Sequence, residues 1–458
     1  MSSWAASVLA LTLIASPGPV AGETNPPSEA LGADYPVLTV SGRSDEPDAR
    51  AGFVEPDGVL SLRQALSLSL LNNPNLAAFA WEIRAREADA LQAGLLANPT
   101  LRVRSENILG TGPYNDADSA ETTIMLGQLV QLGGKRAKRR RVAELRRDLA
   151  DWDYEVQRID VLTAVTQEFV NILEAQSRLE LAQELRDLAD ESLDAVSKRV
   201  KAGAASAVEQ TRAAVNASSA GVAHRRAEAV LAAARARLAA LWGSRAPRFE
   251  RADGELGSIF QPPAFETIAQ RIERNPDVAR WASELDHRKA VIDLQDARRI
   301  PNVNVMGALR QFGEGNESAF VVGFRVPIPV FNLNQGARQA ARSRRSRAFN
   351  DERAARAQSG RDLEVAYAGL RVGYETVITL REDVIPQAEQ AYEGVRTGYL
   401  RGLFRYVDVL DAQRTLFQLR GQELSGLGQF HRAAAAVERL TGTPLRNSSP
   451  DLDPQVEN

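Results

Sequence analysis

The sequence contains no cysteine, only three histidines and few aromatic residues (6%). The missing cysteines exclude disulfides, thiolate metal sites, a catalytic thiol and lipid attachment through an N-terminal cysteine. His224, His287 and His431 are scattered and do not pair at the spacing of metal ligands. No acid–base pair or nucleophile–histidine arrangement is present, so we predict neither an enzyme nor a cofactor. A net charge of −3 argues against a general polyanion binder.

Long apolar runs are also missing after the N-terminus, so no segment has the ~18 residues of a transmembrane helix. Residues 1–22 combine a short apolar run with small residues, which predicts a secretory signal peptide, although the usual basic start is absent. The alternative is a disordered N-terminus. Residues 23–58 are rich in Pro, Gly, Asp and Ser and are predicted to be an extended linker.

The chain repeats itself at an interval of about 200 residues, which is too long for a solenoid unit and indicates a duplicated half. Asn73-Pro74 recurs as Asn275-Pro276, and Gly134 recurs as Gly336. Gly203 matches Gly402 at a slightly shorter interval. The predicted organisation is a first repeat, a linker, a second repeat and a disordered C-terminal tail, at residues 59–243, 244–263, 264–442 and 443–458.

Each half contains two stretches with period-2 alternation after a proline-terminated helix. In the second half Phe320, Val322 and Phe324 alternate with Val321 and Gly323. Alternation over about ten residues suits a transmembrane β-strand, although period alone favours a soluble hairpin. The four predicted strands are about 100–109, 120–131, 302–312 and 319–328.

Long helical patterns follow each strand pair. They run from Lys135 to about Val200 and from Ala337 to about Thr397, with apolar residues seven apart. At ~1.5 Å per residue each helix would be roughly 90–100 Å long. Each then breaks at a glycine, in predicted tips at 200–206 and 398–406, and a second helix returns.

Four membrane strands per chain would leave two open edges, which do not persist in lipid. A membrane barrel needs at least eight strands, so the chain would have to oligomerise. A dimer would supply eight strands and a trimer twelve, and the residues themselves do not choose between them.

Together these marks resemble the outer membrane efflux protein (TolC) family, from about residue 60 to 442. The supporting motifs, in order, are Asn73-Pro74, Asn98-Pro99, Gln131 to Arg136, Val326 to Phe331 with Gly336, and the two tips. The short, polar, cysteine-free sequence looks closest to the heavy-metal, CzcC-like branch of this family.

The resemblance implies a mainly α fold with a β-barrel sector. Three chains would form a twelve-stranded barrel in the outer membrane of a Gram-negative bacterium, continuous with an α-helical barrel in the periplasm. It implies docking to a periplasmic adaptor and an RND-type inner-membrane pump. The expected function is a passive conduit, carrying heavy-metal cations in the CzcC-like branch.

The tips are the first candidate site, because glycine allows a long helix to reverse tightly and leaves the turn free for a partner. The resemblance implies that they dock the adaptor, whereas the simpler alternative is that the glycines only close hairpins. The residues proposed for docking are Val200, Gly203, Ser206, Gly402, Leu403 and Arg405.

A second candidate lies just past the tips. Asp408 and Asp411 are three apart and share a helix face, and Glu209 and Arg212 take their places in the first half. In a trimer the aspartates would form rings of three carboxylates at the entrance, which could favour cation passage or help hold a closed entrance. Because Arg212 takes the place of Asp411 in the first half, such a ring would alternate in sign. The alternative is ordinary surface solvation.

The third candidate is a basic cluster after each strand pair, represented by Lys135, Arg136, Arg338 and Arg342. Its position predicts contacts with headgroups of outer-membrane lipid at the inner edge of the membrane. A solvated helix face is the alternative, and nucleic acid is not an expected partner.

The long helical patterns are also compatible with a different class of function, namely a soluble periplasmic coiled-coil scaffold or an adaptor protein without channel activity. An adaptor should carry a lipoyl-like β-domain, which the sequence does not show.

Overall fold

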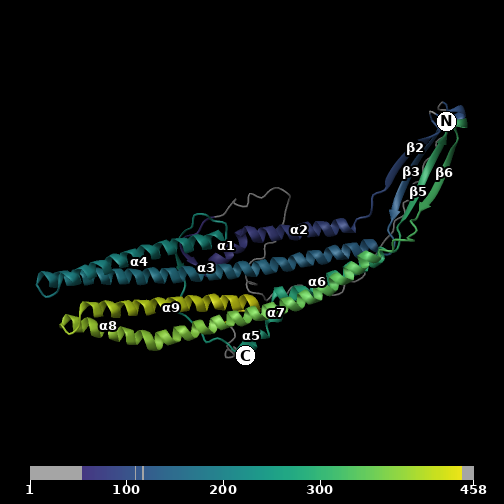
Figure 1. Ribbon diagram of the computed structural model, residues 1–458. Coiled ribbons are helices and arrows are strands. Elements are labelled where there is room, and N and C mark those ends of the chain that lie inside the picture. Colours follow the sequence, from purple (N-terminus) through teal and green to yellow (C-terminus); the bar gives the residue numbers. More distant parts are fainter. Residues whose placement is uncertain (1–53, 109, 116–117, 446–458) are drawn as a thin grey trace, which may run out of the picture.

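A computed structural model describes residues 54–108, 110–115 and 118–445. The chain is elongated, with a β-sheet at one end and helices that extend away from it (Figure 1). The predicted signal peptide, the linker before residue 54 and the tail after residue 445 lie outside the described residues. Of the predicted tail, Leu445 is described and is buried.

The sheet contains four antiparallel strands in the order β2-β3-β5-β6. Each half of the repeat contributes one hairpin, and β3 pairs with β5 where the halves meet. β6 ends before the predicted boundary at 328 because Pro327 and Pro329 cannot donate ladder hydrogen bonds. Outer strands β2 and β6 each have one partner among the described residues. The bounds are β2 (Thr100–Glu106), β3 (Glu121–Val130), β5 (Val303–Phe312) and β6 (Ser318–Arg325).

Long helices continue from the sheet in the same lateral order, since α2 packs on α3, α3 on α6 and α6 on α7. Further from the sheet, α4 packs on α3, α3 on α9 and α9 on α8. The bounds are α2 (Pro74–Gly94), α3 (Lys135–Lys201), α4 (Ala207–Ala240), α6 (Pro276–Ala297), α7 (Gln335–Thr379), α8 (Ile385–Leu400) and α9 (Tyr406–Thr441).

The second descending helix is interrupted, contrary to the prediction of one helix from Ala337 to Thr397. A π-helical turn at Leu380–Val384 separates α7 from α8, and the N–H of Ile385 donates to the carbonyl of Leu380. Pro386 explains the interruption, because it lacks an N–H and its ring would clash with the carbonyl four residues earlier. In the first half, α3 has no such break.

Short strands and helices pack against the middle of the long helices and contain the largest structural difference from the prediction. Strand β1 (Asp57–Ser61) pairs in parallel with β4 (Arg248–Asp253), so both predicted linkers, 23–58 and 244–263, contribute to a sheet. Leu60 and Phe249 bury their side chains beside Phe169 of α3. The shorter elements are α1 (Leu62–Asn72), α5 (Phe265–Ala269) and 3-10 turns at Gly112–Tyr114, Ile272–Arg274 and Glu314–Asn316.

The Asn-Pro pairs join helices end to end. Asn73 caps α2 by accepting the N–H of Leu76 (3.0 Å), and its amide donates to the carbonyl of Leu241 at the end of α4 (2.8 Å). Asn275 likewise caps α6 and donates to the carbonyl of Arg439 in the last turn of α9 (2.9 Å). One asparagine thus satisfies an unpaired N–H of one helix and an unpaired carbonyl of the other.

Candidate functional site

One face of the four-stranded sheet is apolar and uncovered. Residues directly opposite in antiparallel strands share a face. Because of this pairing, one apolar side chain from each of the four strands lies in a continuous row across the sheet, and every one of them is exposed to solvent. The row is Val103 (60% exposed), Ile124 (49%), Leu309 (43%) and Phe320 (89%). Leu101, Leu126, Val305, Val322 and Phe324 extend the same face and are also exposed. A face of this size needs an apolar surrounding.

The opposite face, called the polar face below, carries every charged side chain of the four strands, beside apolar ones such as Ala308 and Val321. Arg104, Thr123 and Arg310 lie side by side on it, and Arg310 bonds to Thr123 (3.2 Å) and to the carboxylate of Glu121 (3.1 Å). A strand that alternates apolar and polar side chains, with the apolar side bare, matches a sheet that separates lipid from water. In the part of the chain that the structure describes, no helix is both long and apolar enough to cross a membrane.

Both predicted tips are tight glycine turns at the far ends of the helical hairpins (Figure 1). Gly203 (φ +72°) and Gly402 (φ +79°) adopt left-handed backbone, and a Cβ on either would meet no atom within 4 Å. The hydrogen bonds repeat as well, since Ala204 bonds to the carbonyl of Arg199 and Leu403 to that of Gly398, each at 2.8 Å. This pattern is the Schellman motif.

The remaining tip residues differ in role. Ser206 caps α4 by accepting the N–H of Glu209 (3.3 Å), and Val200 packs partly buried at the base of the turn. Leu403 and Arg405 are exposed, Leu403 by 74%. The second tip therefore presents an apolar and a cationic side chain to solvent.

The two tips also contact each other, which the sequence did not reveal. The guanidinium of Arg199 lies over the ring of Tyr399 (4.6 Å), and the Tyr399 hydroxyl donates to Glu209 (3.4 Å). Ser192 and Tyr406 bond through their hydroxyls (3.0 Å). Burial raises the pKa of Tyr399 and Tyr406, so both stay neutral at physiological pH. These contacts hold the first hairpin against the second.

The candidate entrance charges are not equivalent. Asp408 caps α9 by accepting the N–H of Arg405 (2.8 Å), which gives it a structural role beside any electrostatic one. Asp411 is exposed one turn further on, and both aspartates line a groove of about 540 Å³ between α8 and α9. Glu209 binds Tyr399 as described, and Arg212 is exposed.

The basic cluster divides between buried and exposed groups. Lys135 is buried and donates to Asn302, and burial followed by the charge of Arg298 lowers its pKa. This contact takes the place of the expected lipid contact for Lys135. Arg338 pairs with Asp296, whereas Arg136 and Arg342 are exposed.

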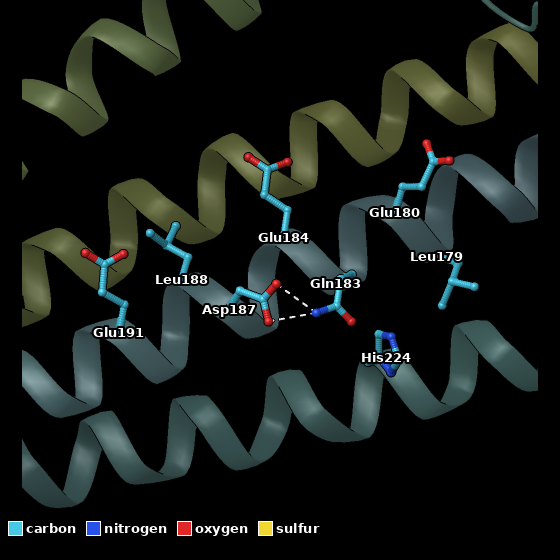
Figure 2. Close-up of a pocket in the computed structure, with 8 residues that line it drawn as sticks. All are labelled: Leu179, Glu180, Gln183, Glu184, Asp187, Leu188, Glu191 and His224. Atoms are coloured by element: carbon cyan, nitrogen blue, oxygen red, sulfur yellow. Dashed lines mark hydrogen bonds between the residues drawn. The ribbon is translucent and has the colours of Figure 1, made fainter.

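Carboxylates line a further groove between α3 and α4 (Figure 2). Glu184 pairs with Arg420 of α9 (2.9 Å), Asp187 accepts from Gln183 (2.7 Å), and His224 lies at the α4 side. Among the described residues, no group of three or more His, Cys, Asp or Glu is arranged to hold a metal ion.

Comparison with known proteins matches the chain to the model of a protein family. The model of the family described as "Outer membrane efflux protein" matches residues 65–244 and 267–443. The chain is 36% identical to the cobalt-zinc-cadmium resistance protein CzcC of Cupriavidus metallidurans, over 85% of this chain and 91% of that protein.

Solved structures agree in fold. A membrane protein from Pseudomonas aeruginosa superposes with a TM-score of 0.73 at 20% identity, covering 85% of this chain and 92% of that one. A structure of CusC gives a TM-score of 0.72 at 17% identity, covering 83% and 91%.

Proposed function

The chain belongs to the outer membrane efflux protein family, and we propose on that premise that three copies form an outer-membrane channel through which metal cations leave the cell. The observation that carries this proposal is the sheet with one bare apolar face and one polar face. The fold and the family support an efflux channel rather than an enzyme, a scaffold or an adaptor.

The two outer strands of the four-stranded sheet support assembly into a closed ring. Strands β2 and β6 would pair between neighbouring copies, so that three chains supply twelve strands and no edge remains in lipid. The helices at the two flanks also carry exposed valines seven residues apart, which is the spacing of a coiled-coil seam. They are Val208, Val215 and Val222 on α4, and Val365 and Val372 on α7.

The cargo is inferred from the metal-resistance relative. CzcC is named for cobalt, zinc and cadmium resistance, and this chain covers nine-tenths of its length. We therefore propose divalent cations of this kind as the transported substrates. The proposed signal peptide at residues 1–22 would direct the chain to the periplasm, where a periplasmic adaptor would dock on the tips and an RND-type pump would supply the energy.

The channel itself is tested with purified protein. In detergent the chain is expected to be a trimer that migrates differently on gels after heating, and in planar bilayers it should give discrete, cation-conducting steps. Size-exclusion chromatography with light scattering and conductance recording make these measurements. A monomer that stays soluble without detergent would favour the scaffold instead and overturn the proposal.

A separate prediction concerns the entrance charges. Asp408→Asn with Asp411→Asn removes six negative charges from a trimer while Asn can still accept hydrogen bonds. We expect the cation-over-anion permeability ratio to fall by about twofold or more, because rings of carboxylates concentrate cations. Reversal potentials in asymmetric salt measure this ratio, with Glu364→Gln, at an exposed site on α7, as the control. Identical reversal potentials in all three proteins would assign the aspartates to solvation and capping alone.

A further inference from the structure

A groove of about 720 Å³ lies beside the sheet, at the ends of the helices that lead into it. The C-terminal part of α2, the first turns of α3 and the C-terminal part of α6 form its walls. Its charged lining consists of four arginines and a single carboxylate, namely Arg86, Arg139, Arg146, Arg298 and Asp89. Arg139 belongs to the basic stretch after the first strand pair, whereas Arg146 and Arg298 lie outside it.

Three of the four arginines are not neutralised. Asp89 pairs with Arg86 (3.2 Å), and the other three guanidinium groups form no ion pair with a carboxylate of the described residues. Their hydrogen bonds go to neutral acceptors instead. Arg139 donates to the carbonyl of Ala93 (2.9 Å), and Arg298 donates to the side chain of Gln295 (3.3 Å).

The third guanidinium is held by a neutral histidine. Arg146 donates through Nε to Nε2 of His287 (3.3 Å). Burial lowers the pKa of His287 to about 4, so at physiological pH its ring is uncharged and accepts the bond. His287 thus orients the guanidinium without compensating its charge.

Two further features point to a ligand. The side-chain oxygen of Gln131, which lines the groove, is buried and has no hydrogen-bond partner, so it could accept from a hydroxyl. Leu95 and Leu96 line the same groove and are exposed, so an apolar chain could pack there. Guanidinium groups bind phosphate oxygens through paired, charge-assisted hydrogen bonds.

We propose that this groove is a binding site for a phosphate group, held by Arg139, Arg146 and Arg298. The phosphate can be a free ion or the headgroup of an anionic phospholipid with its chain against the leucines. Binding of the group itself does not depend on channel activity. Only the lipid source rests on the proposed position of the sheet in the membrane.

The test uses the full chain in detergent with two probes, inorganic phosphate and phosphatidylglycerol. Binding is measured by isothermal titration for the ion and by native mass spectrometry for the lipid. Arg139→Gln with Arg298→Gln removes two contacts, and Arg226→Gln with Arg414→Gln removes the same charge from exposed sites on α4 and α9, outside the groove and the basic cluster. Thermal unfolding checks that both pairs fold.

Affinity for the bound probe is expected to fall at least about tenfold in the groove variant and less than about twofold in the control, because each lost bond to a charged group is worth about a factor of ten. Binding of inorganic phosphate assigns the site to a free ion, and binding of phosphatidylglycerol alone assigns it to lipid. If neither probe binds, or if both variants lose affinity equally, the proposal is wrong. Conductance is recorded in parallel, so a failed channel and a failed groove are distinguished.

Discussion

Val322→Arg is expected to remove the protein from the outer membrane almost completely. Val322 lies on the apolar face of the outer strand β6 and is 85% exposed. An arginine on the lipid face near the middle of a membrane barrel costs about 2–4 kcal/mol, and a trimer would bear this cost three times. We therefore expect heat-modifiable trimer in the membrane fraction, and with it metal resistance, to fall by at least about tenfold.

The neighbouring residue provides a matched control. Val321 pairs with Ala308 on the polar face, so Val321→Arg adds the same side chain on the side that would face a water-filled lumen. This variant should assemble at close to the normal level. Equal loss in both variants would mean that the face does not matter, and normal assembly of Val322→Arg would contradict the membrane position of the sheet.

The second large effect is expected at the far end of the molecule. Gly402→Trp should abolish resistance while leaving the trimer folded, because an indole would occupy the exposed turn proposed to meet the adaptor. No atom lies within 4 Å of a Cβ at this position, so the fold suffers only the cost of left-handed backbone, about 1–2 kcal/mol. Metal tolerance of cells carrying the variant, with trimer measured in the membrane, reports the effect.

Gly112 offers a control with the same backbone strain. It also has positive φ (+65°) and open space, but lies in the β2–β3 connection, at the opposite end of the molecule from the tips. Gly112→Trp should retain most of the resistance. Unchanged efflux in Gly402→Trp would remove the docking role from this tip and leave its glycine as a hairpin closure only.

Elements whose signal is local were predictable from the sequence. The alternation of Phe320, Val322 and Phe324 is visible along the chain because one face of β6 is uniformly apolar. The length of α3 could be predicted because its apolar residues recur at heptad spacing with no proline. The family assignment is confirmed by the match to the outer membrane efflux protein model.

Elements that depend on distant partners could not be predicted. In β4 the two buried residues, Phe249 and Ala252, are three apart, so the strand lacks simple alternation and its partner β1 lies far away in sequence. The π-helical turn needs the register on both sides of Pro386, which periodicity alone does not supply.

The candidate sites divide in the same way. The tip glycines were predictable because a break in a long helix is a local signal, whereas the Arg199–Tyr399–Glu209 contact joins two hairpins. Similarly, Arg139 and Arg146 are seven apart on one face of α3, but Arg298 follows the end of α6, and no spacing in the sequence relates it to them. Docking at the tips, the entrance charges and the lipid contacts of Arg136 and Arg342 stay predictions.

The asparagine joints have a mechanical consequence. Because Asn73 links the end of α4 to the start of α2, and Asn275 links the end of α9 to the start of α6, each pair behaves as one rod that runs from tip to strand. We expect a sideways push on a tip to be transmitted through these joints toward the base of the sheet. The descending helices α3 and α7–α8 also run from the sheet to the tips, so each asparagine joint adds a second mechanical path beside them.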